Sequence, residues 1–138
     1  MRELIHKLVE TSGPSGFEDP IREVIRAEVE DLADEVRVTP LGSLVGVRRG
    51  TGDGRRILLA AHMDEIGVIV THVDKKGFLR FASIGGVSPL NCLGGRVTFE
   101  NGTLGVIGIE EKREDRDKAP KLEQLYIDVG ATEKEDAP

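Results

Sequence analysis

A histidine and two carboxylates follow an apolar run in the stretch LLAAHMDEIG, residues 58–67. A neutral imidazole is a good zinc ligand, and a carboxylate two residues later can hold the other ring nitrogen or supply a second ligand. Because side chains i and i+2 of an extended strand point the same way, His62 and Asp64 can share one face. Glu65 follows the end of the predicted strand, so we expect it only to cap or to hydrogen-bond locally, outside the ligand set. The pattern predicts the edge of a metal site, although such a triplet also occurs in purely structural settings.

The other metal-binding residue types do not complete such a site in the sequence. His6 falls in a predicted helix with no partner nearby, and His72 falls on a predicted strand, so we expect neither to be functional. Cys92 has no histidine close in sequence, which favours a small buried residue over a nucleophile. A catalytic zinc needs about three protein ligands. The sequence therefore offers one imidazole for a site that needs more.

The composition excludes several classes of function. The 138 residues carry a formal net charge of -6, which argues against a nucleic-acid groove because such grooves are basic. No apolar run reaches the length of a membrane span, and the amphipathic N-terminus MRELIHKLVE is not a signal peptide. A single cysteine cannot form an internal disulfide, which indicates a reducing compartment. We expect a cytoplasmic protein with no nucleic-acid and no membrane partner.

Hydrophobic periodicity predicts two helices followed by strands. Residues 3–10 and 20–33 each place their apolar side chains on one helical face. From residue 35 the period changes to two, which is typical of strands. The Asn101-Gly102 pair between RVTFE and TLGVIGIE is the strongest hairpin signal in the chain. The expected strands are 35–39, 44–49, 56–62, 66–73, 78–83, 96–100, 103–109 and 124–129.

The turn TSGPSG, residues 11–16, separates the two predicted helices. Asp19 precedes Pro20, the pattern of an N-cap followed by a proline in the first helical turn. Ser15 and Glu18 stand three residues apart and fit a capping box. We favour this structural role for Ser15 over a catalytic one.

The two halves of the chain differ in hydrophobic pattern and in glycine content. Residues 1–66 end in the near-continuous apolar run ILLAA, which is typical of a strand covered on both faces in a layered α/β domain. Residues 67–123 have short Gly-rich strands and no helical stripe, which indicates a small barrel or sandwich. The charged stretch EEKREDRDK, residues 110–118, is expected to be a solvated loop.

Several motifs follow one another along essentially the whole chain: TSGPSGFEDPIR, LLAAHMDEIGVIV, FASIGG, GGRVTFENGTLGVIG and LYIDVGA. Together they resemble the start of a tetrahedral or glutamyl aminopeptidase, a family of dinuclear metallopeptidases that also has members labelled endoglucanases. The chain departs from the family pattern at Ser43, where Asn is frequent, and at Gly95, where Gln is frequent. The family's Lys-Pro-Pro-His-Leu also reads Lys118-Ala119-Pro120-Lys121-Leu122 here. These departures concern the barrel and the subunit contacts rather than the family.

The resemblance implies an enzyme that removes N-terminal residues from peptides with two divalent metal ions, usually zinc or cobalt. By motif match, His62 is the first metal ligand and Asp64 is the carboxylate that orients it. The family's bridging aspartate, base glutamate and remaining ligands lie downstream of the strand that matches LYIDVGA. The family's intervening segment is a β-barrel dimerisation domain, and in many members the dimers assemble into hollow tetrahedral dodecamers.

We therefore expect an α/β fold that begins with the N-terminal part of a layered α/β metallopeptidase domain, residues 1–68. An inserted small β-barrel dimerisation domain follows at 69–124, and a return strand to the truncated catalytic domain follows at 125–138. The chain alone is expected to bind metal weakly and to lack peptidase turnover, because the downstream ligands and base are absent. The alternative is a non-catalytic oligomerisation or binding module that keeps the barrel and has lost the chemistry.

Overall fold

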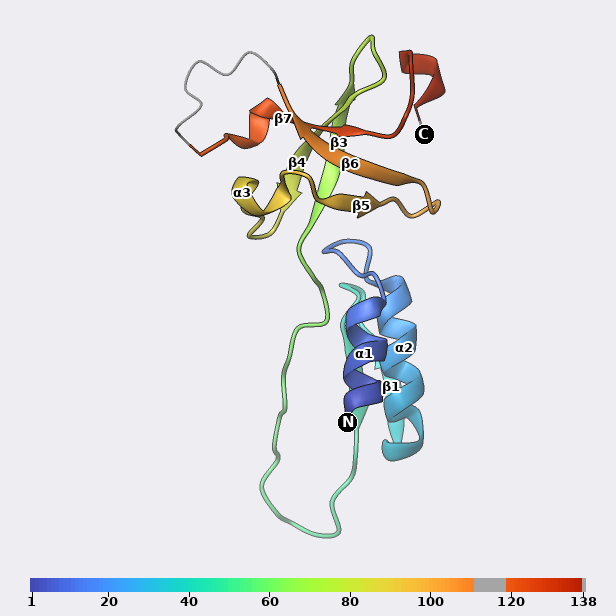
Figure 1. The fold of residues 1–138 in the computed structure, drawn as a ribbon. Helices are drawn as coiled ribbons and strands as arrows, with labels where there is room; N and C mark the ends of the chain where they lie inside the picture. The colour runs from blue at the N-terminus through green and yellow to red at the C-terminus, as the bar shows by residue number, and fades with distance from the viewer. Residues whose placement is uncertain (111–118, 138) are drawn as a thin grey trace. The chain divides into compact units, whose positions relative to one another are not determined.

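The computed structural model describes residues 1–110 and 119–137, so nearly all of the charged stretch predicted as a loop lies outside the described residues. The chain forms two compact units, Met1–Glu65 and Ile66–Pro138. The first contains helices and a two-stranded sheet, and the second contains a five-stranded sheet (Figure 1). The fold is therefore mixed α/β. In the part that the structure describes, no helix is both long and apolar enough to cross a membrane.

Two amphipathic helices open the first unit, as their hydrophobic periodicity predicts. Helix α1 spans Arg2–Glu10, and α2 spans Asp19–Val29 before the chain tightens into a 3-10 turn at Glu30–Leu32. The helices contact one another, and the Lys7 ammonium lies 2.7 Å from a Glu28 carboxylate oxygen. Both helices keep most of their apolar side chains partly exposed.

A β-hairpin follows the helices. Strands β1 (Glu35–Val38) and β2 (Leu44–Val47) pair antiparallel. The connecting turn needs Gly42, whose φ of +85° lies in the left-handed region that favours glycine. The Gly42 carbonyl accepts a hydrogen bond from the Arg22 guanidinium at 3.2 Å, which ties the hairpin to α2.

Residues 56–62 do not form the predicted central strand, and that prediction is wrong for this structure. The segment has no regular secondary structure (Figure 1), and Ile57, Leu58 and Leu59 are 85%, 88% and 90% exposed. A strand needs a neighbouring backbone to satisfy its N–H and C=O groups. In the described part of the first unit, the sheet consists of β1 and β2 alone. The apolar run is therefore present without the neighbours that would bury it.

The second unit is built on an antiparallel sheet with the strand order β3-β4-β7-β6-β5. A short helix, α3 (Pro89–Cys92), links β4 to β5, and 3-10 turns flank the last strand at Leu122–Gln124 and Lys134–Asp136. Among the residues described, β3 and β5 do not pair with each other, so the sheet is open and the closed barrel is not seen. The strands are Gly67–Val73 (β3), Leu79–Ile84 (β4), Arg96–Thr98 (β5), Leu104–Ile109 (β6) and Leu125–Asp128 (β7).

Strand β7 lies between β4 and β6 at the centre of this sheet. The sequence predicted that residues 125–138 return to the first domain, whereas the structure places β7 in the second unit. The cause is the alternation along the strand, because Leu125 and Ile127 are 1% and 0% exposed in the core. They pack there with Leu79, Phe81 and Ile107.

The hairpin predicted at Asn101-Gly102 is confirmed. It joins β5 to β6, with the Phe99 N–H donating to the Thr103 carbonyl at 2.9 Å. Gly102 has a φ of +85°, and the Asn101 side chain accepts a hydrogen bond from the Thr103 N–H at 3.0 Å. This is the turn chemistry that Asn-Gly supplies.

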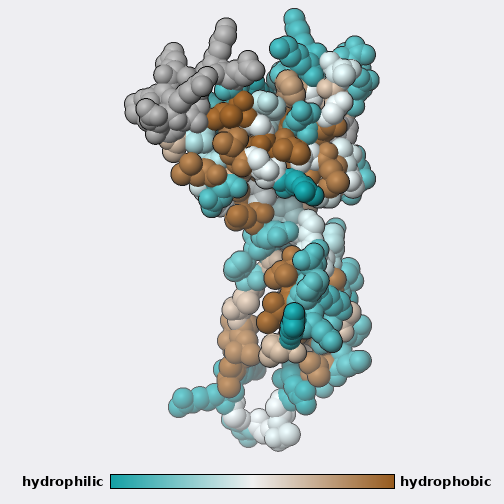
Figure 2. All heavy atoms as spheres, in the orientation of Figure 1, coloured by the Kyte–Doolittle hydropathy of each residue, from teal (hydrophilic) through white to brown (hydrophobic). Residues whose placement is uncertain are grey.

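Apolar side chains also reach the surface of both units (Figure 2). In the second unit they include Leu90, Leu104 and Val106, which are 63%, 63% and 49% exposed. In the first unit they include the consecutive residues Ile57, Leu58 and Leu59. Exposed apolar residues in clusters are typical of surfaces that another chain or segment covers.

Candidate functional site

His62 and Asp64 lie together at the end of the exposed apolar segment. The Nδ1 atom of His62 lies 3.0 Å from the Asp64 carbonyl oxygen and 3.2 Å from the Asp64 Oδ1 atom. Because both oxygens can only accept, the nitrogen that faces them carries the proton in the neutral ring. The other nitrogen, Nε2, then keeps its lone pair, and the His62 side chain is 86% exposed. The structure therefore brings the predicted pair together in the arrangement that a metal-binding histidine needs.

The turn before α2 packs its backbone against the same segment. Pro14 and Glu65 form an isolated parallel β-bridge, and the Glu65 N–H donates to the Gly13 carbonyl at 3.0 Å. The Gly13 N–H donates in return to the Glu65 Oε1 atom at 3.1 Å. Glu65 thus makes hydrogen bonds within the fold, but they are not the local ones that the sequence predicted. Its partner is 52 residues away along the chain.

Gly13 is required at this turn by close packing. A Cβ atom placed on Gly13 would lie 2.3 Å from the Cγ2 atom of Ile21, closer than side-chain atoms approach one another. Ile21 is itself buried, at 4% exposed, on the inner face of α2. The turn, the helix and the segment that carries His62 are therefore held together through one small residue.

Ser15 does not cap α2, so the predicted capping box is wrong. The N-cap is Glu18, which makes no side-chain cap hydrogen bond and instead accepts one from the Gly16 N–H at 2.7 Å. The Ser15 hydroxyl donates to the Asp64 Oδ2 atom at 2.5 Å. Sequence reasoning missed this contact because the two residues stand 49 positions apart. The one available signal was that both motifs, GPSG and HMDE, belong to the same family pattern.

Hydrogen bonding lowers the pKa of Asp64 below its ordinary value. The largest cause is the hydrogen bond from the Ser15 hydroxyl; desolvation acts in the opposite direction, and the Asp64 backbone amide and the His62 ring add to the lowering. Asp64 is therefore ionised at neutral pH. An ionised carboxylate accepts hydrogen bonds on both oxygens, and here one faces Ser15 and the other faces His62.

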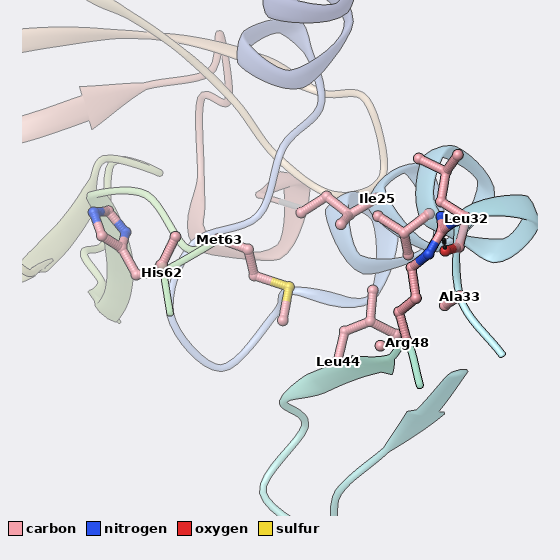
Figure 3. Close-up of a pocket in the computed structure, with 10 residues that line it drawn as sticks. Ile25, Leu32, Ala33, Leu44, Arg48, His62 and Met63 are labelled. Atoms are coloured by element: carbon pink, nitrogen blue, oxygen red, sulfur yellow. Dashed lines mark hydrogen bonds between the residues drawn. The ribbon is translucent and has the colours of Figure 1, made fainter. Parts of the chain in front are cut away.

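An apolar cavity of about 380 Å³ lies beside this pair (Figure 3). Met63 points into it, toward Ile25 of α2 and Leu44 of β2, whereas the His62 ring points to the opposite side of the segment. Arg48 also lines the cavity and donates from Nη1 to the Leu32 carbonyl at 3.1 Å. The cavity is suited to apolar side chains rather than to an ion.

The described residues, 1–110 and 119–137, contain no group of three or more His, Cys, Asp or Glu side chains that could hold a metal ion. His6 lies on α1 and His72 lies on β3, and neither joins such a group. Cys92 packs partly buried against the core of the second unit, and burial raises the pKa of its thiol. The described residues thus offer one position suited to a metal ligand, the Nε2 atom of His62, and not a complete metal site.

Comparison with known proteins places these residues in context. The family model of the M42 glutamyl aminopeptidases matches residues 42–138, more than half of the chain. A protein of Acetivibrio thermocellus, provisionally named an aminopeptidase, is 48% identical over 137 residues. That match covers 99% of this chain and 41% of the relative. The chain thus spans well under half the length of the curated relatives it matches.

Solved structures of aminopeptidases also resemble this chain. The chain superposes on a TET aminopeptidase from the marine sediment archaeon Thaumarchaeota archaeon SCGC AB-539-E09 with a TM-score of 0.88 and 37% identity, covering 99% of this chain and 40% of that one. It superposes on the TET1 peptidase of Pyrococcus horikoshii with a TM-score of 0.81 and 37% identity, covering 98% and 42% of the two chains. The latter is described as able to assemble into a tetrahedron or a large octahedral shell.

Proposed function

This chain belongs to the M42 glutamyl aminopeptidase family, and we propose that it supplies the N-terminal portion of a metal-dependent aminopeptidase that removes N-terminal residues from peptides. The observation that carries the proposal is the His62–Asp64 pair, in which Nδ1 faces the aspartate and Nε2 is free. A histidine held in this way presents a defined lone pair, which is what a metal ligand requires.

The family is metal-dependent, and two divalent ions, zinc or cobalt, are the proposed cofactors. When bound, they polarise the scissile carbonyl and lower the pKa of a water molecule. In this chain His62 would hold one ion through Nε2, and Asp64 would fix the ring by accepting a hydrogen bond from Nδ1–H. The remaining ligands and the general base come from polypeptide that the relatives carry beyond the matched length.

The exposed segment at 57–61 fits the same proposal. In the complete domain it pairs with further strands of a layered α/β sheet, which would bury Ile57, Leu58 and Leu59 and satisfy their backbone groups. Among residues 1–110 and 119–137, strand β2 also has an unpaired edge in the two-stranded sheet of the first unit. The first unit, with its proposed boundary near residue 68, is then one part of the catalytic domain.

The second unit is proposed to be the small β-barrel domain that makes the protein a homo-oligomer. It exposes Leu90, Leu104 and Val106, and its sheet has two open edge strands, β3 and β5, in the part that the structure describes. A two-fold dimer is the usual closed arrangement, and assembly of such dimers into a dodecamer is part of this proposal. Light scattering of the purified chain is expected to give a dimer mass, and a monomer at high concentration would contradict this assignment.

A reducing compartment fits the single free cysteine, so the proposed location is the cytoplasm.

The competing function is a non-catalytic oligomerisation or binding module. It is favoured by one observation, that the described residues supply a single metal ligand. A stable oligomer that binds no metal even when the remaining length of the domain is restored would favour this alternative.

The proposal is tested in a chimera that joins residues 1–138 to the remaining length of the Acetivibrio thermocellus relative, which is 48% identical. The assay follows release of an N-terminal residue from chromogenic aminoacyl substrates with added zinc or cobalt. We expect turnover in the chimera, its loss on chelation, and its loss in the His62→Ala variant. His72→Ala, which changes a histidine outside any ligand group among the described residues, is the matched control and is expected to keep activity. Full activity of His62→Ala would contradict the proposal.

A further inference from the structure

The carboxylate that holds His62 has a second partner, which the metal chemistry alone does not require. We propose that Ser15 is a positioning residue: its hydroxyl fixes the Asp64 carboxylate, which in turn keeps the His62 ring oriented with Nε2 free for a metal ion. The proposal rests on the proposed function of His62. It gives the GPSG turn a role in the site rather than in capping α2.

The geometry assigns each carboxylate oxygen to a different partner. Asp64 Oδ2 accepts from the Ser15 hydroxyl at 2.5 Å, while Oδ1 lies 3.2 Å from His62 Nδ1. The Asp64 side chain is 38% exposed, so water competes for both oxygens. A hydroxyl fixed on one oxygen restricts the rotation that would otherwise turn the other oxygen away from the ring.

The backbone that carries Ser15 is itself held in place. Gly13 and Glu65 exchange two hydrogen bonds, at 3.0 and 3.1 Å, and Pro14 bridges to Glu65. Gly13 packs so closely on Ile21 that a Cβ atom would not fit. Support of this kind is what keeps a binding residue in a productive geometry. Ser15 is thus presented to Asp64 by a turn that is fixed on both sides.

The test is the tautomer of the neutral His62 ring, read from imidazole 15N chemical shifts of the metal-free 138-residue chain. His6 and His72 serve as internal references. In the unchanged chain we expect the form protonated on Nδ1 to predominate. In Ser15→Ala the ratio should shift toward the form protonated on Nε2 by about two- to tenfold, the change that corresponds to one net hydrogen bond. The Asp64 carbonyl still faces Nδ1, so the shift is partial.

Three matched variants isolate the effect. Ser15→Thr keeps a hydroxyl and should keep the ratio. Ser12→Ala removes a hydroxyl from the same turn that has no hydrogen-bond partner among residues 1–110 and 119–137, and it should leave the ratio unchanged. In an Asp64→Ala background, Ser15→Ala should add nothing, because Ser15 acts through Asp64. An unchanged ratio in Ser15→Ala, or a full additional effect in the Asp64→Ala background, would overturn the proposal.

A zinc titration of the chimera, which restores the remaining length of the domain, separates this inference from the proposed function. If zinc perturbs the His62 Nε2 resonance while Ser15→Ala leaves the tautomer unchanged, the role of Ser15 is wrong and that of His62 stands. If Ser15→Ala shifts the tautomer but zinc leaves Nε2 unperturbed, the hydrogen-bond chain stands and the metal role of His62 fails.

Discussion

The two units of this chain use apolar residues in opposite ways. In the second unit, Ile127 and Leu125 alternate into a core and are essentially unexposed. In the first unit, Leu58 and Leu59 are consecutive apolar residues that stand about nine-tenths exposed. The difference is one of partners, because β7 has a strand on each side and the 57–61 segment has none in the part of the chain described. A run of apolar residues therefore indicates what a segment can bury, and its neighbours decide whether it is buried.

The core residues and the residues with candidate chemistry lie in different units. The residues that make the core of the second unit are aliphatic and aromatic and carry no titratable group. The residues with candidate chemistry lie in the first unit, on a segment held by a turn and a few hydrogen bonds. Functional groups placed on such lightly supported segments depend on the contacts that fix them.

The largest expected effect is in the second unit. Ile127→Ala removes most of a side chain that is fully buried and should destabilise this unit by about 2–5 kcal/mol. The measurement is urea unfolding followed by a probe in the second unit. As a control, Val70→Ala on edge strand β3, where the side chain is 37% exposed, should cost clearly less. Equal costs for the two variants would mean that the core is misplaced.

The second effect concerns packing in the first unit. Gly13→Ala places a Cβ atom 2.3 Å from Ile21 and should destabilise this unit by about 1–3 kcal/mol through overpacking. Gly52→Ala is the matched control, because a Cβ atom there meets nothing within 4 Å. Amide chemical shifts of α2 and of residues 62–65 should move in Gly13→Ala and not in Gly52→Ala. A silent Gly13→Ala would show that the turn does not pack on α2.

A third prediction concerns pH. The folded-state pKa of Asp64 lies below its value of about 3.9 in an unfolded chain. The hydrogen bond with Ser15 therefore stabilises the folded state fully at pH values above about 3.9. The contribution is lost as the pH falls through the lowered folded-state pKa. Below about pH 4, the amide resonances of Ser15 should therefore shift reversibly with acid. The Asp64→Asn variant should lack this shift, and an identical shift in that variant would assign it to another group.

The smallest expected effect comes from a substitution in the exposed apolar segment of the first unit. Leu59→Ala would cost about 2–5 kcal/mol if Leu59 were buried in the strand that the sequence predicted at 56–62, but it should change the stability of this chain by less than about 0.5 kcal/mol. The reason is that its side chain is 90% exposed. In the chimera with the remaining length of the relative, the same change should become costly. A large loss in the chain alone would mean that the segment is already buried.

Local signals predicted much of the fold. The Asn101-Gly102 hairpin was found because turn chemistry depends on the turn residues themselves. The pairing of His62 with Asp64 was found because an i, i+2 spacing acts over one stretch of extended chain. Both predictions needed only residues that are neighbours in sequence.

Signals that depend on distant residues were missed. Ser15 fits a capping box by spacing, yet its hydroxyl bonds to a carboxylate 49 positions away, and no local pattern encodes that choice. The 56–62 strand and the place of β7 failed for the same reason, since strand pairing is set by partners elsewhere in the chain. The family pattern identified which segments matter without showing which contacts join them.

The central claim is that His62 presents Nε2 to a metal ion while Asp64 holds Nδ1. The most direct measurement is a crystal structure of the chimera grown with zinc, with the metal located by anomalous scattering. The claim predicts zinc at about 2.0–2.1 Å from His62 Nε2, the usual zinc–nitrogen distance, with Asp64 still facing Nδ1. Zinc bound without His62, or bound through Nδ1 with Asp64 displaced, would contradict it.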